Sequence, residues 1–300
     1  MSSQFHCYFI GLGALGGAFA AQILKHNPSQ IEVIAKGERA QRLQSGITVN
    51  GEHFPLTVVD SPSKKADLII IAVKYPQLEE AIEDIKPFVA SDTLIMPILN
   101  GLYSKERLIE VFGDDRVVPA FGIAMDCSKS GNNIYYKHLG RLVFGDENNT
   151  QKSQRVLRIE KFFQENQLPY EVPVDMNRAM WFKFMLNAGV NQVSSHLGMN
   201  FSHFQKDGEP RELMKAAAQE VLEIAKRKGI DLRDEDIDLM VETINKLDPE
   251  GKTSMLQDIE ARRITEVDYF SGHIIKMGKE LGVKTPINEM LYQSIKSKEQ

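Results

Sequence analysis

The sequence predicts an α/β protein, with an N-terminal Rossmann-type, doubly wound sheet followed by an all-α C-terminal half. Up to about residue 172, short apolar runs alternate with helical patterns, which is typical of βαβ units and a parallel sheet. Residues 68–73 are apolar throughout and fit a strand that is covered on both faces. From residue 173 the periodicity is almost entirely helical. We therefore predict two domains, an α/β domain over residues 1–172 and a helical domain over residues 173–300.

The elements follow from these patterns and from the Gly and Pro breakers between them. The strands predicted in the first half are His6–Ile10, Ile31–Ala35, Leu68–Val73, Thr93–Ile98 and Val117–Phe121. Its predicted helices are Ala14–Lys25, Gln77–Phe88, Lys105–Phe112 and Gln151–Asn166. Short strands at Asn133–Tyr136 and Arg141–Phe144 are predicted to form an antiparallel addition at the edge of this sheet, and a last short strand is predicted at Tyr170–Val172. The helices predicted in the second half are Asp175–Gln192, Pro210–Lys228, Arg233–Leu247, Ser254–Ala261, Thr265–Leu281 and Ile287–Ser297.

Composition excludes several classes of function. A net charge of -5 over 300 residues gives no electrostatic footprint for nucleic acid. No apolar run is long enough to span a membrane, and the first residues lack a signal-peptide pattern. Cys7 and Cys127 lie far apart in apolar stretches, and the histidines form no metal-ligand pair. We expect a cytoplasmic protein without a metal. A homodimer is one possible assembly state, because helical second domains often pair.

A glycine-rich loop follows the first predicted strand and opens a helix. Its residues Gly11, Leu12, Gly13, Ala14, Leu15 and Gly16 match the dinucleotide fingerprint G-x-G-x-x-G. In that motif the first glycine permits a tight turn, the second lets the backbone approach the pyrophosphate, and the third lets helix and strand pack closely. The helix N-terminus also favours a negative phosphate. A glycine-rich turn without a ligand is the alternative.

The end of the second predicted strand bears on the choice between NAD and NADP. An acid there usually bonds the ribose 2′-hydroxyl of NAD, whereas a cation suits the 2′-phosphate of NADP. Here Lys36 stands at the strand end, with Arg39 beyond it, and we predict NADPH. The alternative is that both cations are solvated and that Glu38 is the usual acid.

Two further polar residues follow strands of the predicted sheet. Lys74 comes directly after residues 68–73, and Asn100 comes shortly after the strand at residues 93–98. Ligands of open parallel sheets bind outside the carboxyl ends of the strands, so both side chains are candidates for the nicotinamide end of the site. A surface lysine and an Asn-Gly turn are the alternatives.

The predicted helix around residues 180–191 is apolar except for one row of polar residues. Lys183, Asn187 and Asn191 are spaced i, i+4, i+8 and lie along one face. Burying them without partners costs several kcal/mol. They therefore face structural acceptors or a ligand. An ammonium beside a ketone polarises the carbonyl and supplies the proton that reduction requires, so Lys183 is the candidate general acid.

Two later segments each open a predicted helix. Ser254 and Gln257 fit a capping box, and a cap hydroxyl is also able to hold a substrate carboxylate. Glu266 complements a helix dipole or orients Lys183 and keeps it protonated. Asp258 is expected to be structural.

In the order of these motifs, the chain resembles the ketopantoate reductase (2-dehydropantoate 2-reductase) family over nearly its whole length. The specific stretches are the row that begins at Lys183 and the segment 252–258 followed by Glu266. The chain departs from the family at Leu99 and Tyr103, where the family often has Gln and a small residue. A tyrosine so near the cofactor edge could reshape the pocket.

The resemblance implies that NADPH reduces 2-dehydropantoate to (R)-pantoate, on the route to pantothenate and coenzyme A. It implies that Lys183 is the general acid and that Glu266 bonds the lysine and the substrate hydroxyl. The residues implied to hold substrate are Asn100, Asn187, Asn191, Ser254 and Lys74. Those implied to bind the cofactor are the residues from Gly11 to Gly16 with Lys36, Lys74, Asn100 and Glu266.

Two rival functions remain open. The first is a reductase of another small 2-oxo acid, or a β-hydroxyacid dehydrogenase-like oxidoreductase of similar architecture, although the spacing from Ser254 to Glu266 favours the ketopantoate pattern. The second is a non-catalytic NADPH sensor, which would bind the dinucleotide without turnover. The intact set of lysine, amides and acid favours an enzyme.

Overall fold

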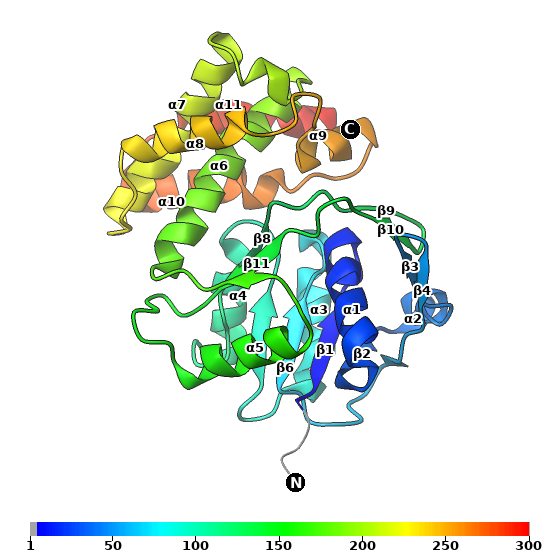
Figure 1. The fold of residues 1–300 in the computed structure, drawn as a ribbon. Coiled ribbons are helices and arrows are strands. Elements are labelled where there is room, and N and C mark those ends of the chain that lie inside the picture. Colours follow the sequence, from blue (N-terminus) through cyan, green and yellow to red (C-terminus); the bar gives the residue numbers. More distant parts are fainter. Residues whose placement is uncertain (1–4, 300) are drawn as a thin grey trace. The chain divides into compact units, whose positions relative to one another are not determined.

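The computed structural model describes residues 5–299, which divide into two compact units (Figure 1). One contains the chain up to Asn100 together with Ser104–Met176, and the other contains Gly101–Tyr103 and the chain from Asn177 onward. Within residues 5–299, no helix is both long and apolar enough to cross a membrane.

The first unit is built on a five-stranded parallel sheet in the order β5-β2-β1-β6-β7, so the predicted Rossmann-type sheet is confirmed. The strands, in that order, are Val58–Val59, Ile31–Ile34, Cys7–Ile10, Leu68–Ile71 and Leu94–Pro97. Strand β1 is central because it pairs with both β2 and β6. The strands point the same way, so their carboxyl ends form a single edge.

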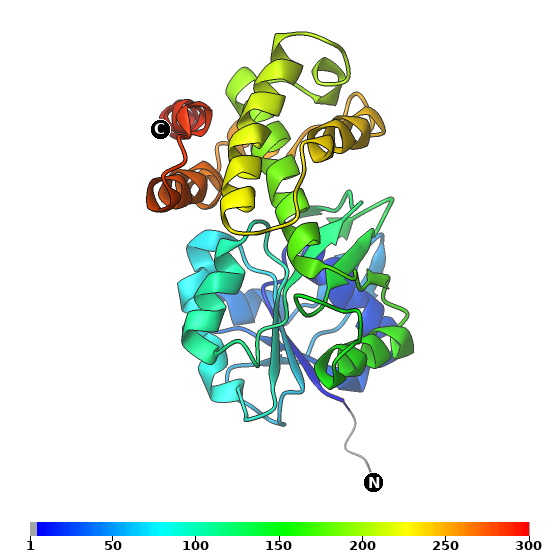
Figure 2. The ribbon, with the colours of Figure 1, turned by 90° about the vertical axis from the view of Figure 1, so that its left-hand side faces the viewer.

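Helices cover both faces of this sheet (Figure 2). Helices α1 (Ala14–His26) and α5 (Gln154–Glu165) lie on one face, and α3 (Leu78–Ile85) and α4 (Tyr103–Phe112) lie on the other. Side chains of β1 alternate between these layers: Cys7 and Phe9 join the apolar core beneath α1 and α5. Tyr8 points the other way and contacts Phe88, with ring centroids 4.9 Å apart.

Two smaller sheets complete the first unit, so the prediction that Asn133–Tyr136 and Arg141–Phe144 are added at the edge of the parallel sheet is wrong. One has the order β4-β3-β10-β9 and contains Glu52–Phe54, Ile47–Val49, Asn133–Tyr135 and Ser128–Ser130. The other has the order β12-β11-β8 and contains Tyr170–Glu171, Arg141–Phe144 and Ala120–Ile123. The short helix α2 (Gly37–Leu43), which the sequence analysis missed, follows β2.

The prediction of one strand over Val117–Phe121 is wrong. Val117 makes an isolated parallel bridge to Ile95, whereas β8 (Ala120–Ile123) pairs antiparallel with β11 in a different sheet. Pro119 stands between them and has no N–H to donate to a ladder, which separates the bridge from the strand.

The second unit is helical. Its helices are α6 (Met176–Leu197), α7 (Glu209–Arg227), α8 (Glu235–Asn245), α9 (Ser254–Glu260), α10 (Ser271–Leu281) and α11 (Pro286–Lys298). The prediction of one continuous helix over Thr265–Leu281 is wrong, because a 3-10 turn at Val267–Tyr269 precedes α10. The Thr265 hydroxyl accepts the Val267 N–H and donates to Glu299, and such side-chain bonds compete with helix formation.

A buried polar network joins four helices of this unit. The Asn288 side chain on α11 is fully buried; it donates to Glu220 Oε2 on α7 at 2.7 Å and accepts from Gln192 Nε2 on α6 at 3.1 Å. Gln192 also accepts the backbone N–H of Ser271, the first residue of α10, at 2.9 Å. Each buried polar group therefore has a partner, which low-dielectric surroundings require.

Removing one member of this network is expected to destabilise the helical unit. Asn288→Ala removes the side-chain bonds to Glu220, Gln192 and Ala217, and each hydrogen bond contributes about 0.5–1.5 kcal/mol net, so the total loss should be about 1–3 kcal/mol. We expect thermal and urea unfolding to show a loss of this size. The exposed, neighbouring Glu289→Ala is the control, and an Asn288→Ala chain as stable as that control would contradict the network's role.

Candidate active site

The glycine loop lies at the carboxyl end of β1, where the chain turns into α1. Gly11 has a φ of +90°, and a Cβ there would lie 2.6 Å from the backbone of Ala72 and Val73. A Cβ on Gly16 would lie 2.4 Å from the Gly11 carbonyl oxygen. Both positions therefore require glycine, one for the turn and one for close packing of α1 against the strands.

Gly13 differs from these two glycines because it has open space beside it. The nearest atom to a Cβ built there is the Ala72 carbonyl oxygen, 3.8 Å away. Gly13 is also the N-cap of α1, and no side chain caps that end. An exposed backbone at a helix N-terminus fits a pyrophosphate, so the loop suits a dinucleotide cofactor.

One residue that touches this loop was missed by sequence analysis. The Lys129 amine on β9 donates a hydrogen bond to the Leu12 carbonyl oxygen. Desolvation, followed by repulsion from Arg42, lowers the pKa of Lys129. No local pattern points to this contact, because the two residues are 117 positions apart in the chain.

The predicted cations at the end of β2 lie where expected, but each is paired. Lys36 Nζ lies 2.7 Å from Asp84 Oδ1, and Arg39 Nη2 lies 3.3 Å from Glu80 Oε2. The hydrogen bond to Asp84 is the main cause of a raised pKa at Lys36. Both acids come from α3, and nothing in their sequence spacing indicated these pairs.

Lys74 and Asn100 lie at the same edge of the parallel sheet as the glycine loop. Lys74 is exposed just beyond β6, and Asn100 follows β7 before Gly101, whose φ is +82°. The Tyr75 hydroxyl donates to the Asn100 carbonyl oxygen and so ties the two loops together. The first unit thus gathers its predicted cofactor residues at one edge.

Helix α6 carries the polar row of the second unit. Asn187 and Asn191 are buried, at 3% and 8% exposure, and Lys183 is half-buried one turn earlier. Over residues 5–299, no hydrogen bond satisfies the Lys183 amine or either side-chain amide. These three side chains therefore do not belong to a structural hydrogen-bond network. The side chain of Gln192, next to Asn191, does belong to one and is fully bonded.

Desolvation by the surrounding protein lowers the pKa of Lys183 from its usual 10.5 to about 8. An ammonium with such a pKa holds its proton at neutral pH and gives it up more readily than a solvated lysine. This matches the requirement for a general acid near working pH.

Ser254 and Glu266 lie on segments that are tied to α6. Thr253 Oγ1 donates to Ser194 Oγ on α6 at 3.1 Å, directly beside Ser254. Phe270 stacks on Phe184 at 5.8 Å, a few residues after Glu266. The bonds and stacking around α6 thus bring both segments to the helix that carries the polar row.

The predicted capping box at Ser254 and Gln257 is wrong. Thr253 is the N-cap of α9, and its hydroxyl accepts the Leu256 N–H at 3.2 Å. Gln257 instead donates to the Lys252 carbonyl oxygen at 3.0 Å. The threonine takes the cap because it stands one residue earlier with extended backbone, which leaves the exposed Ser254 hydroxyl uninvolved in the cap.

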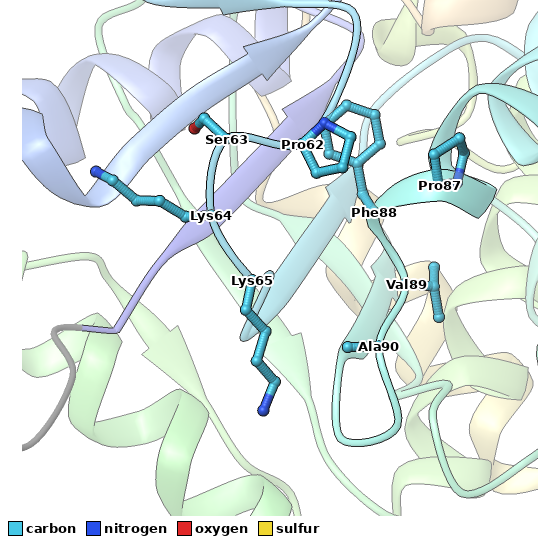
Figure 3. A pocket seen from close by; sticks show the side chains of 8 residues that line it. All are labelled: Pro62, Ser63, Lys64, Lys65, Pro87, Phe88, Val89 and Ala90. Atoms are coloured by element: carbon cyan, nitrogen blue, oxygen red, sulfur yellow. The ribbon is translucent and has the colours of Figure 1, made fainter.

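A hollow of about 330 Å³ lies elsewhere in the first unit (Figure 3). It is lined by residues 62–65, which precede β6, and 87–90, which precede β7, and so lies at the amino ends of these strands. Lys64 and Lys65 point in different directions there, and Lys65 pairs with Asp92. It is separate from the edge that carries the candidate cofactor residues. No group of three or more metal-ligating side chains occurs in the described part of the chain.

A Rossmann-type sheet with a glycine loop, and a helix that carries a desolvated lysine and two amides, are features typical of oxidoreductases that use a dinucleotide. Comparison with known proteins agrees. Residues 7–149 match the profile of "Ketopantoate reductase PanE/ApbA", and residues 175–299 match its C-terminal counterpart. The chain belongs to the ketopantoate reductase family of oxidoreductases.

Individual relatives cover almost the entire chain. A 2-dehydropantoate 2-reductase of Aquifex aeolicus is 25% identical, over 97% of this chain and 96% of its own. A dimeric ketopantoate reductase of Staphylococcus aureus superposes with a TM-score of 0.82 at 21% identity, covering 99% of both chains. A D-mandelate dehydrogenase, solved with NADH and anilino(oxo)acetate, gives a TM-score of 0.85 at 22% identity, covering 98% of both. Structures at this identity share the fold, and their substrates differ.

Proposed function

We propose that this protein reduces a small 2-oxo acid with NADPH, and that 2-dehydropantoate is the substrate. The single observation that carries the proposal is the polar row of α6, in which the side-chain polar groups of Lys183, Asn187 and Asn191 have no hydrogen-bond partner within residues 5–299. Side-chain polar groups that lie in a largely buried row and have no partner in the described chain are available to bind a ligand. A bound 2-oxo acid has the oxygens to do so.

The nicotinamide, when bound, supplies the hydride. In the proposed reaction Lys183 donates its proton to the ketone oxygen as the carbonyl carbon accepts that hydride, so the C=O double bond becomes a C–O single bond and new C–H and O–H bonds form. The lysine then recovers a proton from solvent. We propose that Asn187 and Asn191 orient the acid, that the Ser254 hydroxyl bonds its carboxylate, and that Glu266 orients the lysine. Lys74 and Asn100 would hold the nicotinamide end.

Steady-state oxidation of NADPH with a panel of 2-oxo acids tests this function. We expect the highest kcat/KM with 2-dehydropantoate and formation of (R)-pantoate. A panel without any turnover, despite NADPH binding, would favour the non-catalytic sensor.

A second candidate substrate is an aromatic 2-oxo acid, because a cluster of aromatic side chains includes a residue close to Glu266 in the sequence. Tyr103, where the family often has a small residue, packs against Tyr269 and His273 with ring centroids 5.3 and 5.9 Å away. Tyr269 lies three residues after Glu266. Phenylglyoxylate therefore belongs in the panel, and a kcat/KM above that of 2-dehydropantoate would identify this candidate as correct.

The pH dependence of the reaction follows from the lowered pKa of Lys183. Reduction needs the ammonium, so kcat/KM for the 2-oxo acid should be level below the pKa of about 8 and fall above it. The slope should approach about tenfold per pH unit. Oxidation of the 2-hydroxy acid needs the neutral amine and should rise through the same pH. If kcat/KM for reduction and for oxidation changed in the same direction through this pH range, a single lysine acid would be excluded.

We further propose a cytoplasmic homodimer with a role in pantothenate and coenzyme A synthesis. The S. aureus relative is dimeric. Light scattering of the purified chain measures the assembly, and complementation of a pantothenate-requiring strain tests the role.

A further inference from the structure

We propose that Asp84 and Glu80 limit the preference of this chain for NADPH over NADH, because they occupy the two cations suited to a 2′-phosphate. The proposal deepens the proposed function and rests on only one part of it, the binding of a nicotinamide dinucleotide at the glycine loop. It identifies two acids of α3 as residues that determine cofactor specificity.

Both cations suited to a 2′-phosphate already form an ion pair with an acid of α3. Lys36 stands two residues beyond β2 and bonds Asp84 Oδ1 at 2.7 Å, while Arg39 on α2 lies 3.3 Å from Glu80. Asp84 is 8% exposed, so its carboxylate relies on Lys36 for its partner. A 2′-phosphate would have to share the lysine with this carboxylate or displace it.

Negative charge outweighs positive charge around Lys36 and Arg39. Besides Asp84 and Glu80, Asp60 lies just past β5, the strand that pairs with β2. The pKa of Lys36 is raised, first by its hydrogen bond to Asp84 and further by the charges of Asp84, Asp60 and Glu80. Two cations thus face at least three carboxylates. A phosphate carrying about -1.5 to -2 charge gains little net attraction there.

A ribose 2′-hydroxyl meets a different situation. It is neutral and needs only a hydrogen bond, and the Lys36–Asp84 pair offers both a donor and an acceptor. The pair is also neutral as a whole, so binding the hydroxyl breaks no ion pair. NADH should therefore bind with an affinity close to that of NADPH.

Nucleotide fragments measure this subsite without any turnover. Calorimetry compares adenosine 2′,5′-bisphosphate with 5′-AMP on the full chain and on Asp84→Asn and Glu80→Gln. We expect the wild-type chain to bind the bisphosphate less than about tenfold more tightly, and Asp84→Asn to raise that ratio by about three- to tenfold. Glu80→Gln should raise it less, because Glu80 is exposed and its ion pair is longer. The control is Glu83→Gln on the same helix, whose partner is Lys86.

Several results would overturn the proposal. A wild-type ratio above about tenfold would show that the acids do not limit the preference. A lower ratio in Asp84→Asn would instead make Asp84 a group that positions Lys36 for the phosphate. If Asp84→Asn unfolds, the exposed Glu80→Gln decides, and an unchanged ratio there contradicts the proposal. Fragment binding needs no 2-oxo acid, so failure of the proposed reductase activity is a separate result.

Discussion

Replacing Lys183 with alanine is expected to lower kcat for the 2-oxo acid by about 10²–10⁴, the usual loss when a general acid is removed. The ketone oxygen then has to take its proton from water, which is not positioned by the protein. KM for NADPH should change little, because the glycine loop and Lys36 belong to the other unit. Exogenous primary amines should restore part of the rate, since they are able to donate the missing proton.

The fold should withstand this substitution. The Lys183 amine has no bonding partner in the described chain, and desolvation is the cause of its lowered pKa. Its removal therefore costs no ion pair and should leave the melting temperature nearly unchanged. Lys276→Ala, an exposed lysine on α10, is the matched control and should keep full activity. Activity of Lys183→Ala within threefold of this control would disprove the proposed role.

The two features that sequence alone predicted best are local. The row of Lys183, Asn187 and Asn191 follows directly from helical periodicity, because an apolar helix leaves little doubt about which residues share a face. The glycine loop is equally local, and its neighbours β1 and α1 begin close to their predicted positions. Their roles in binding and catalysis stay predictions.

Other features depend on contacts between distant segments. Lys129 reaches the Leu12 carbonyl from β9, and Asp84 reaches Lys36 from α3; neither contact leaves a pattern in the sequence. The strands β3, β4 and β9 are three residues each, too short for alternation to be seen. The cap of α9 was misplaced by one residue because Thr253 and Ser254 are both good caps, and only the backbone conformation chooses between them.

Substitutions of Gly11 and Gly13 in the glycine loop should also have large effects, and the two substitutions should differ in what they change. In Gly11→Ala the new methyl would lie 2.6 Å from backbone atoms of Ala72 and Val73, at a φ of +90°. Overpacking and a left-handed backbone together should cost about 2–4 kcal/mol of unfolding free energy. The chain should therefore lose both stability and cofactor binding.

Gly13→Ala separates these two losses. Its φ of -67° suits alanine, and the new methyl would have no atom nearer than 3.8 Å, so only the poorer N-cap should matter, at a cost of about 1 kcal/mol or less. The methyl would nevertheless fill the space through which a pyrophosphate approaches the backbone, and dinucleotide affinity should fall by about tenfold or more. Urea unfolding and NADPH titration measure the two quantities. Normal affinity in Gly13→Ala would mean that the dinucleotide does not lie on this loop, because steric exclusion by the methyl does not depend on how the substrate binds.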